Sequence, residues 1–250
     1  MYHRNDFRFS QLKLVLEPPT PPDTEWDGIS YNSSMQQILP GVYAHSILSI
    51  FQYFIVDSSQ ITLIDAGLPL FTSSLVKAFA SLNGNTNLNL ILITHADGDH
   101  YGAVHHLKAA HNFRTATSAP EAQAMASGSM SRELKPRNIF ERLLFSTALP
   151  TFTARAVIVD TIIHPGDTLP ILGGLQVLDS AGHTPGHLSF YQAERRLLFA
   201  GDSIIKRRGI PSPAFGPNCW DEKLARSAYD RQMSLEPLHI CGGHSYFNLS

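Results

Sequence analysis

The 250-residue sequence predicts an α+β domain in which two sheets pack face to face and helices cover their outer surfaces. Runs typical of strands occur near both ends of the chain, and strand-like and helix-like runs alternate between them. No repeat of solenoid length is present in the sequence. Hydrophobic periodicity alone does not separate this arrangement from an ordinary α/β domain.

The composition bounds the class of protein. Apolar residues make up 43% of the chain and charged residues 16%, which is typical of a globular protein. The net charge of −2 argues against a nucleic acid as partner, because surfaces that bind nucleic acids are basic. No apolar run approaches the roughly 18 residues of a membrane helix, and residues 1–9 lack the apolar stretch of a secretion signal. We therefore expect a cytoplasmic protein with no membrane partner, whose Cys219 and Cys241 are reduced thiols.

The chain divides into an N-terminal arm, residues 1–36, and one domain, residues 37–250. Within the arm, the proline-rich segment 17–23 cannot form a helix or an interior strand. The domain opens with β-rich runs that end at polar turn residues, which predicts strands over 37–45, 50–56 and 61–65.

The middle of the domain alternates helices and strands. Residues 70–82 carry apolar side chains at helical spacing, whereas residues 88–94 form the continuous apolar run of a strand buried on both faces. A helix, a strand and a helix that begins with proline are then expected over 100–110, 114–117 and 120–126.

Residues 127–155 are expected to form a variable insertion, either a lid or an interface. Gly128 and Pro136 interrupt the pattern there, and only 139–144 has helical spacing. After the insertion the sequence predicts five strands, over 156–159, 168–172, 175–180, 188–192 and 196–200. A helix over 221–234 and a last short strand over 238–241 follow.

The segment His95-Ala96-Asp97-Gly98-Asp99-His100 places four potential metal ligands within six residues, directly after a buried strand. Strand ends are where α/β proteins place their chemistry. Residues two apart in extended chain point the same way, so the first three polar side chains can converge, and Gly98 lets the backbone turn to bring in His100. Imidazole and carboxylate together suit zinc, iron or manganese.

Three further candidates each follow a predicted strand, and each is preceded by a glycine: His183, Asp202 and His244. Any one of them alone is more often an ordinary turn or loop residue. Four potential ligands are more than one ion would take from a single short loop. Other segments of the chain must therefore complete the sites. Taken together, in this order, the three candidates and the first cluster indicate a metal centre.

The segment from about Gln37 to His244 resembles the metallo-β-lactamase superfamily. The first motif of that family is His-x-His-x-Asp-His, and this sequence has His95-x-Asp97-x-Asp99-His100. The later motifs and the strand-end Asp-x-Gly of the family match Gly182-His183, Gly201-Asp202, Gly243-His244 and Asp65-Ala66-Gly67. The resemblance implies a four-layer αββα sandwich with metals at one edge between the sheets, and Asp65 as a support residue rather than a ligand.

The resemblance also implies two divalent metal ions, with zinc expected and iron or manganese as alternatives. It assigns His95, Asp97 and His183 to the first ion. It assigns Asp99, His100 and His244 to the second ion, and Asp202 to the bridge between the two ions. Asp99 is also the candidate catalytic residue, because it could orient the nucleophile or carry a proton. His187 is expected to have a structural role.

Two departures from the family pattern matter. Asp97 stands where the family usually has histidine. Either it binds metal as a carboxylate, which favours iron or manganese and makes the bound water less acidic, or it is too short and the first site is weak or empty. Secondly, the family usually continues with a helix after its last histidine, whereas only residues 245–250 remain here, so an earlier segment such as the arm could cover the sheet.

The function expected from the resemblance is a dinuclear metal-dependent hydrolase, whose metal-bridging hydroxide attacks a small ester, lactone or thioester. The segment Gly182-His183-Thr184-Pro185-Gly186-His187 is similar to the lactonase and thioesterase branches of the family. Two alternatives stay open. One is a diiron redox enzyme related to flavodiiron oxygen reductases, which also carry a carboxylate at the position of Asp97, and the other is a non-catalytic metal-binding module. The partner is expected to be a small-molecule substrate, and the oligomeric state stays open.

Overall fold

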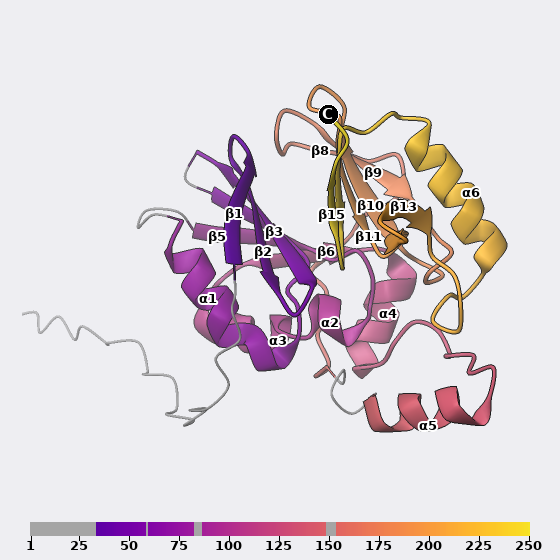
Figure 1. Ribbon diagram of the computed structural model, residues 1–250. Coiled ribbons are helices and arrows are strands. Elements are labelled where there is room, and N and C mark those ends of the chain that lie inside the picture. The colour runs from indigo at the N-terminus through magenta and orange to yellow at the C-terminus, as the bar shows by residue number, and fades with distance from the viewer. Residues whose placement is uncertain (1–33, 59, 83–86, 149–153) are drawn as a thin grey trace, which may run out of the picture. The chain divides into compact units, whose positions relative to one another are not determined.

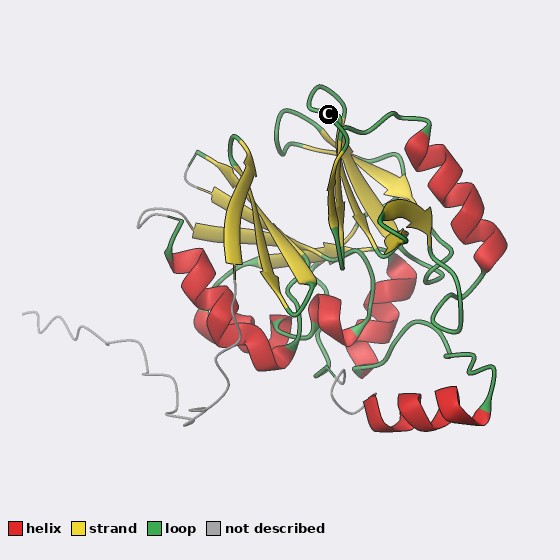
Figure 2. Ribbon diagram, viewed as in Figure 1, coloured by secondary structure: helices red, strands yellow, loops and turns green. Residues whose placement is uncertain are grey.

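Two mixed sheets pack against each other, with helices on their outer sides (Figures 1 and 2). The computed structural model describes residues 34–58, 60–82, 87–148 and 154–250. Most of the expected arm and part of the expected insertion, residues 149–153, lie outside these ranges. The predicted α+β class and the four-layer arrangement are confirmed.

The first sheet has seven strands in sequence order, β1 to β7. Neighbours from β1 to β4 pair antiparallel, and neighbours from β4 to β7 pair parallel. The parallel half therefore points its carboxyl ends to one edge. The strands span Ser34–Leu39, Val42–Ile47, Ile50–Asp57, Gln60–Ile64, Asn87–Leu92, Arg114–Thr117 and Thr161–Ile162.

The second sheet has the order β15-β14-β11-β10-β9-β8, in which only β11 and β14 pair parallel. Two further strands, β12 and β13, form a hairpin directly after β11. The strands from β8 to β15 span Thr168–Leu169, Leu175–Asp179, Leu188–Gln192, Leu197–Gly201, Ile204–Arg207, Ile210–Pro213, His239–Gly242 and Tyr246–Asn248.

Seven helical segments complete the described part of the chain. They are η1 (Pro69–Phe71), α1 (Thr72–Ala80), α2 (Gly98–Tyr101), α3 (Val104–Ala110), α4 (Ala119–Ser127), α5 (Ile139–Ala148) and α6 (Glu222–Met233). Among the described residues, no helix combines the length and the apolar character that crossing a membrane requires.

Three apolar layers hold the sandwich together. The layer between the sheets joins side chains such as Ile55 and Leu92 of the first sheet to Phe190 and Phe199 of the second. A second layer packs α1, α3 and α4 onto the outer face of the first sheet, and a third packs α6 onto the outer face of the second. Burial of this apolar surface is the main force that stabilises the arrangement.

Several element predictions need correction. The single strand expected over 37–45 is two antiparallel strands, because Pro40 offers no N–H and Gly41 takes a φ of +76° in the turn between them. Strand β1 begins at Ser34, inside the range expected for the arm. The helix expected over 100–110 is divided into α2 and α3.

Two further corrections concern the second half of the chain. Residues 156–159 form no strand; Val157 instead bonds its N–H to the carbonyl of Met125 and enters the core, and the strand follows at β7. The hairpin β12–β13 and the edge strand β15 were not expected. Strand β15 pairs with β14 at the edge of the second sheet, and α6 packs on the outer face of that sheet.

Gly182 is the contact point between the second sheet's loop and α6. It has a φ of +150°, and a Cβ there would collide with the backbone of Ala225 in α6. We predict that Gly182→Ala lowers the free energy of unfolding by roughly 3 kcal/mol, since overpacking and unfavourable backbone both contribute. Denaturant unfolding measures it.

Gly173→Ala is the matched control, because Gly173 has a φ of +80° but open space within 4 Å. It should cost about 1 kcal/mol from backbone strain alone. Equal losses in the two variants would contradict the steric explanation.

Candidate metal centre

The seven predicted ligands meet at one edge of the sandwich. His95 and Asp97 follow β5, and Asp99 and His100 lie in α2. The other three follow β9, β11 and β14, as expected: His183, Asp202 and His244. Their donor atoms form three groups in which all atoms lie within 4.8 Å of one another: His95, Asp97 and His183; His95, His100 and Asp202; and Asp99, His100 and His244.

The second site has the spacing of a tetrahedral metal site. His244 Nε2 lies 3.3 Å from Asp99 Oδ2 and 3.4 Å from Asp202 Oδ2, and His100 Nε2 lies 3.4 Å from Asp202 Oδ1. Donor atoms that each lie about 2.1 Å from one tetrahedral zinc ion are about 3.4 Å apart. Asp99, His100 and His244 therefore form one candidate site, and Asp202 contacts both of its histidines.

Hydrogen bonds fix the tautomers of both histidines at the second site. His100 Nδ1 donates to Asp65 Oδ2 at 2.8 Å, and His244 Nδ1 faces the carbonyl oxygen of Ser49 at 3.1 Å and donates to it. Each Nε2 thus keeps its lone pair for the centre. A histidine whose second nitrogen donates to a carboxylate or carbonyl is the usual form of a metal ligand.

Asp65 supports more than one ligand. It accepts bonds from the backbone N–H and the hydroxyl of Thr94, both at 2.8 Å, in addition to the bond from His100. The Thr94 oxygen in turn accepts from His95 Nδ1 at 3.0 Å, because its proton points to Asp65. The prediction that Asp65 supports the site without being a ligand agrees with this geometry.

Three buried atoms of the predicted ligands have no hydrogen-bond partner among the described residues: His95 Nε2, His100 Nε2 and Asp202 Oδ1. Leaving a buried polar atom unsatisfied costs about 1–3 kcal/mol, so a cation that all three can bind would stabilise this arrangement. Gly243 keeps the space open, since a Cβ there would collide with Asp202 Oδ1 and His100 Cε1. The residues of the second site therefore fit a metal ion.

The electrostatics of the second site also favour a cation. The negative charge of Asp202 raises the pKa of His244 well above its ordinary value. Burial lowers the pKa of His100, but the charges of Asp202, Asp65 and Asp99 outweigh burial and hold that pKa well above its usual range. These shifts show that negative charge dominates the surroundings of both histidines, which a bound cation would offset.

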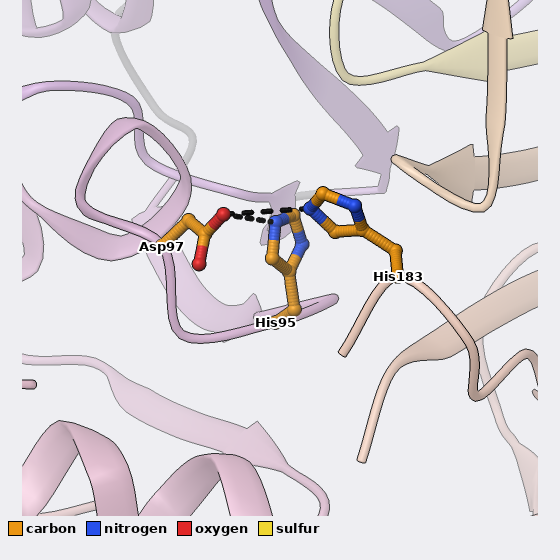
Figure 3. A group of neighbouring side chains, drawn as sticks. All are labelled: His95, Asp97 and His183. Carbon is orange, nitrogen blue, oxygen red and sulfur yellow. Dashed lines mark ion pairs between the residues drawn. The ribbon is translucent and has the colours of Figure 1, made fainter. Parts of the chain in front are cut away.

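The first site is arranged differently. His95 Nε2 and His183 Nε2 both lie 3.4 Å from Asp97 Oδ2 (Figure 3). Arg132, from the segment between α4 and α5, donates through Nη1 to Asp97 Oδ1 at 2.6 Å and through Nη2 to Asp97 Oδ2 at 2.8 Å. Its Nη2 also lies 3.2 Å from His183 Nε2. The predicted ligands are brought together, but two of them are bound to a guanidinium.

The cation of Arg132 changes the titration of its neighbours. Burial, together with the charge of Arg132, lowers the pKa of His183 to about 4. Burial raises the pKa of Asp97, but His95, His183 and Arg132 outweigh it and hold the pKa well below its ordinary value. His183 is thus neutral and Asp97 ionised near neutral pH.

His187 does not bind metal in this geometry. Its Nδ1 donates to Ser180 Oγ at 2.7 Å, and its Nε2 accepts the backbone N–H of Asp202 at 3.1 Å. Both nitrogens are occupied, which agrees with the structural role expected for it. Through the second bond His187 positions the loop that carries Asp202.

Sequence reasoning missed two residues that hold the site. Glu121, fully buried in α4, accepts the N–H of Ala96 at 2.8 Å, the hydroxyl of Thr184 at 2.7 Å and the N–H of Gly186 at 2.8 Å, and so ties together the loops after β5 and β9. A glutamate in a first helical turn gives no signal of this role. Arg132 lies in a segment without regular periodicity, so nothing in the sequence marked it.

Solvent reaches the centre mainly at the second site. The exposed fraction of the side chain is 38% for His244, but only 7% for His183, 1% for His100 and 0% for His95. Asp99 is exposed to 11% at the same edge. Asp97 of the first site is exposed to 14%, so His244 is the most exposed of the predicted ligands.

Asp65→Asn tests the support network. An asparagine amide cannot accept every proton that the carboxylate accepts, so the Nδ1–H of His100 or the Thr94 hydroxyl loses its partner. We predict that metal affinity falls by about 10–100-fold, as measured by competition with a chromophoric chelator. Asp57→Asn, at an exposed turn, should leave affinity unchanged. An unaltered affinity in Asp65→Asn would contradict the proposed support.

The sequence was compared with known proteins. The model of the metallo-beta-lactamase superfamily matches residues 47–244. An uncharacterized protein of Bacillus subtilis (strain 168), YobT, is 28% identical over 207 residues, which cover 78% of this chain and 82% of that protein. The probable metallo-hydrolase YflN of the same organism is 26% identical over 222 residues, covering 82% and 83%. A hydroxyacylglutathione hydrolase of Ectopseudomonas mendocina (strain ymp) is 30% identical over 131 residues, which cover 52% of this chain and 38% of that enzyme.

Solved structures show the same fold. A metallo-beta-lactamase of Cronobacter sakazakii superposes with a TM-score of 0.59 at 21% identity, covering 84% of this chain and 77% of that chain. The superfamily protein ST1585 of Sulfolobus tokodaii gives a TM-score of 0.60 at 20% identity, covering 80% and 76%. Since the family model spans most of the domain, from the first sheet to the last ligand, this chain belongs to the metallo-beta-lactamase superfamily.

Proposed function

We propose that this chain is a metal-dependent hydrolase that cleaves a small ester, lactone or thioester at the second site. The observation that carries the proposal is the set of three buried atoms without hydrogen-bond partners, His95 Nε2, His100 Nε2 and Asp202 Oδ1. Four other buried side-chain atoms of the described residues also lack partners, but His95, His100 and Asp202 have donor atoms within 4.8 Å of one another, which supports a shared cation. The open edge at His244 gives a substrate access to it.

The donor set of the second site is two imidazoles, His100 and His244, and two carboxylates, Asp99 and Asp202. This mixture suits zinc, with iron or manganese as alternatives. A divalent ion bound there lowers the pKa of a coordinated water towards 7 and polarises the oxygen of a carbonyl group.

The protein's own residues supply the rest of the chemistry. Burial raises the pKa of Asp99, but the charges of His100 and His244 hold it below its ordinary value, so Asp99 is ionised at neutral pH. Its carboxylate lies at the exposed edge, within 3.3 Å of His244 Nε2. We assign Asp99 the task of orienting the attacking water and accepting its proton. His100 stays fixed by Asp65 throughout.

The substrate class is an acyl compound. The hydroxyacylglutathione hydrolases similar to this chain are named for the hydrolysis of a thioester, and the chain covers about half or less of their length. Esters and lactones react by the same attack on a carbonyl carbon. The segment from Gly182 to His187, which is similar to lactonase and thioesterase branches, supports the same choice.

The two alternative functions lose support in this geometry. Asp97 was the feature that favoured a diiron redox enzyme, but both of its oxygens accept bonds from Arg132. A non-catalytic module is disfavoured because all four donors of the second site are retained and solvent reaches them. Hydrolysis is therefore the function that we propose.

Metal removal tests the proposal directly. Dialysis against a chelator should abolish hydrolysis of a panel made of an acyl-glutathione thioester, a nitrophenyl ester and a γ-lactone. Addition of zinc should restore it, because no other group of the second site polarises the carbonyl. Initial rates before and after reconstitution measure this. Full activity of the metal-free protein on one of these compounds would refute a metal-dependent mechanism.

Gly243→Ala tests whether the second site is the one that acts. The added Cβ would collide with Asp202 and His100, so we predict at least a roughly 100-fold loss of kcat/KM with the fold retained. Gly166→Ala is the control for loss of stability, since its φ of +96° brings backbone strain while its Cβ has nothing within 4 Å. Steady-state kinetics with circular dichroism of both variants measure the effect. Wild-type kinetics in Gly243→Ala would place the reaction elsewhere.

A further inference from the structure

We propose that the guanidinium of Arg132 takes the place of the first metal ion of the family, so that this chain holds one ion, at the second site. The inference deepens the proposed function, and it rests on that function for the ion at the second site. Arg132 makes the two sites different. The first site already contains a cation, the guanidinium of Arg132, whereas the second site has donor atoms but no cation.

Arg132 already occupies lone pairs of His183 and Asp97 at the first site. Arginine has only donors, so His183 Nε2 must be the acceptor of its 3.2 Å contact with Arg132 Nη2. A neutral imidazole has one such lone pair, which can accept a proton or bind a metal ion but cannot do both. Both oxygens of Asp97 accept from the same guanidinium. Each of these oxygens keeps a second lone pair, so Asp97 is partly engaged and His183 Nε2 fully engaged, whereas His95 Nε2 has no hydrogen-bond partner.

Arg132 is held in this position from behind. Its Nε donates to the carbonyl of Asn218 at 2.7 Å, and its side chain is only 2% exposed. Lys135, three residues later, bonds through its backbone N–H to the carbonyl of Pro217 and through Nζ to that of Trp220. The segment before α5 is therefore anchored on loop 217–220, and Arg132 is a built part of the site rather than a surface side chain that has folded inwards.

The same contact explains why residue 97 is an aspartate. A buried arginine requires a carboxylate partner, and a bidentate pair satisfies a guanidinium best. A histidine at position 97, as the family usually has, could not accept two parallel bonds from Arg132. Asp97 in the first motif and Arg132 thus belong together. Their ion pair stands where the family has a metal ion and a histidine ligand.

The charges of the centre agree with a single ion. Asp97, Asp99 and Asp202 carry three negative charges, Arg132 cancels one, and one divalent ion cancels the other two. His95 is not left without a role, because its Nε2 belongs to the group with His100 and Asp202, and the rings of His95 and His100 are 3.9 Å apart between centroids. It can serve the single ion.

Metal stoichiometry tests the inference without relying on activity. The full chain is stripped with chelator and titrated with cobalt(II), and bound ion is counted by visible absorbance and by elemental analysis after dialysis. We expect one equivalent for wild type and two for Arg132→Ala, because removal of the guanidinium frees Asp97 and His183. Lys135→Ala, which loosens the same segment but leaves the guanidinium in place, is the matched control and should bind one equivalent.

Asp97→Asn covers the case in which Arg132→Ala does not fold. If Asp97 serves Arg132 and not a metal, this variant binds one equivalent, like wild type. Two equivalents in wild type, or one in a folded Arg132→Ala, would overturn the inference while leaving the proposed hydrolase intact. Loss of an equivalent in Asp97→Asn would also overturn it. No bound cobalt in wild type would refute the proposed function together with the inference.

Discussion

The carboxylate of Asp65 provides the hydrogen bonds on which the geometry of the candidate metal centre depends. Asp65 ends β4 with a φ of +57°, an unfavourable conformation for a residue other than glycine. In that position it binds the backbone and hydroxyl of Thr94 after β5 and the imidazole of His100 in α2. One side chain thus connects two parallel strands to the first helix of the site. Because Thr94 passes the bond on to His95, the orientation of two ligands follows from one strained residue.

The second sheet is joined to this network through buried polar groups rather than through apolar packing alone. Glu121 holds the loop after β5 against the loop after β9, and His187 holds the backbone of Asp202. These bonds lie where the two sheets meet at their open edge, at which the apolar layer between them ends. Each donor loop therefore has a fixed place before any ion binds. Such preorganisation limits the reorganisation that metal binding and catalysis require.

The sequence was informative where chemistry is local. Strand ends followed by glycine and a polar residue predicted His183, Asp202 and His244, and all three lie at the centre. It was uninformative where a role depends on contacts between distant segments. Arg132 reaches Asp97 across 35 residues and is held by Asn218 across 86, and neither contact leaves a periodic pattern. The strands β1 and β15 were missed or misplaced for a related reason: short edge strands are defined by their partners more than by their composition.

The pairing of Asp97 with Arg132 also limits which single substitutions this part of the molecule tolerates. A metal ion and a buried guanidinium both place positive charge beside His183, yet the guanidinium brings directional donors that must all be satisfied. Here Asp97, His183 and the Asn218 carbonyl together accept four hydrogen bonds from it. Removing only one partner of such a buried pair costs about 3–5 kcal/mol, so neither Asp97 nor Arg132 can change alone at little cost.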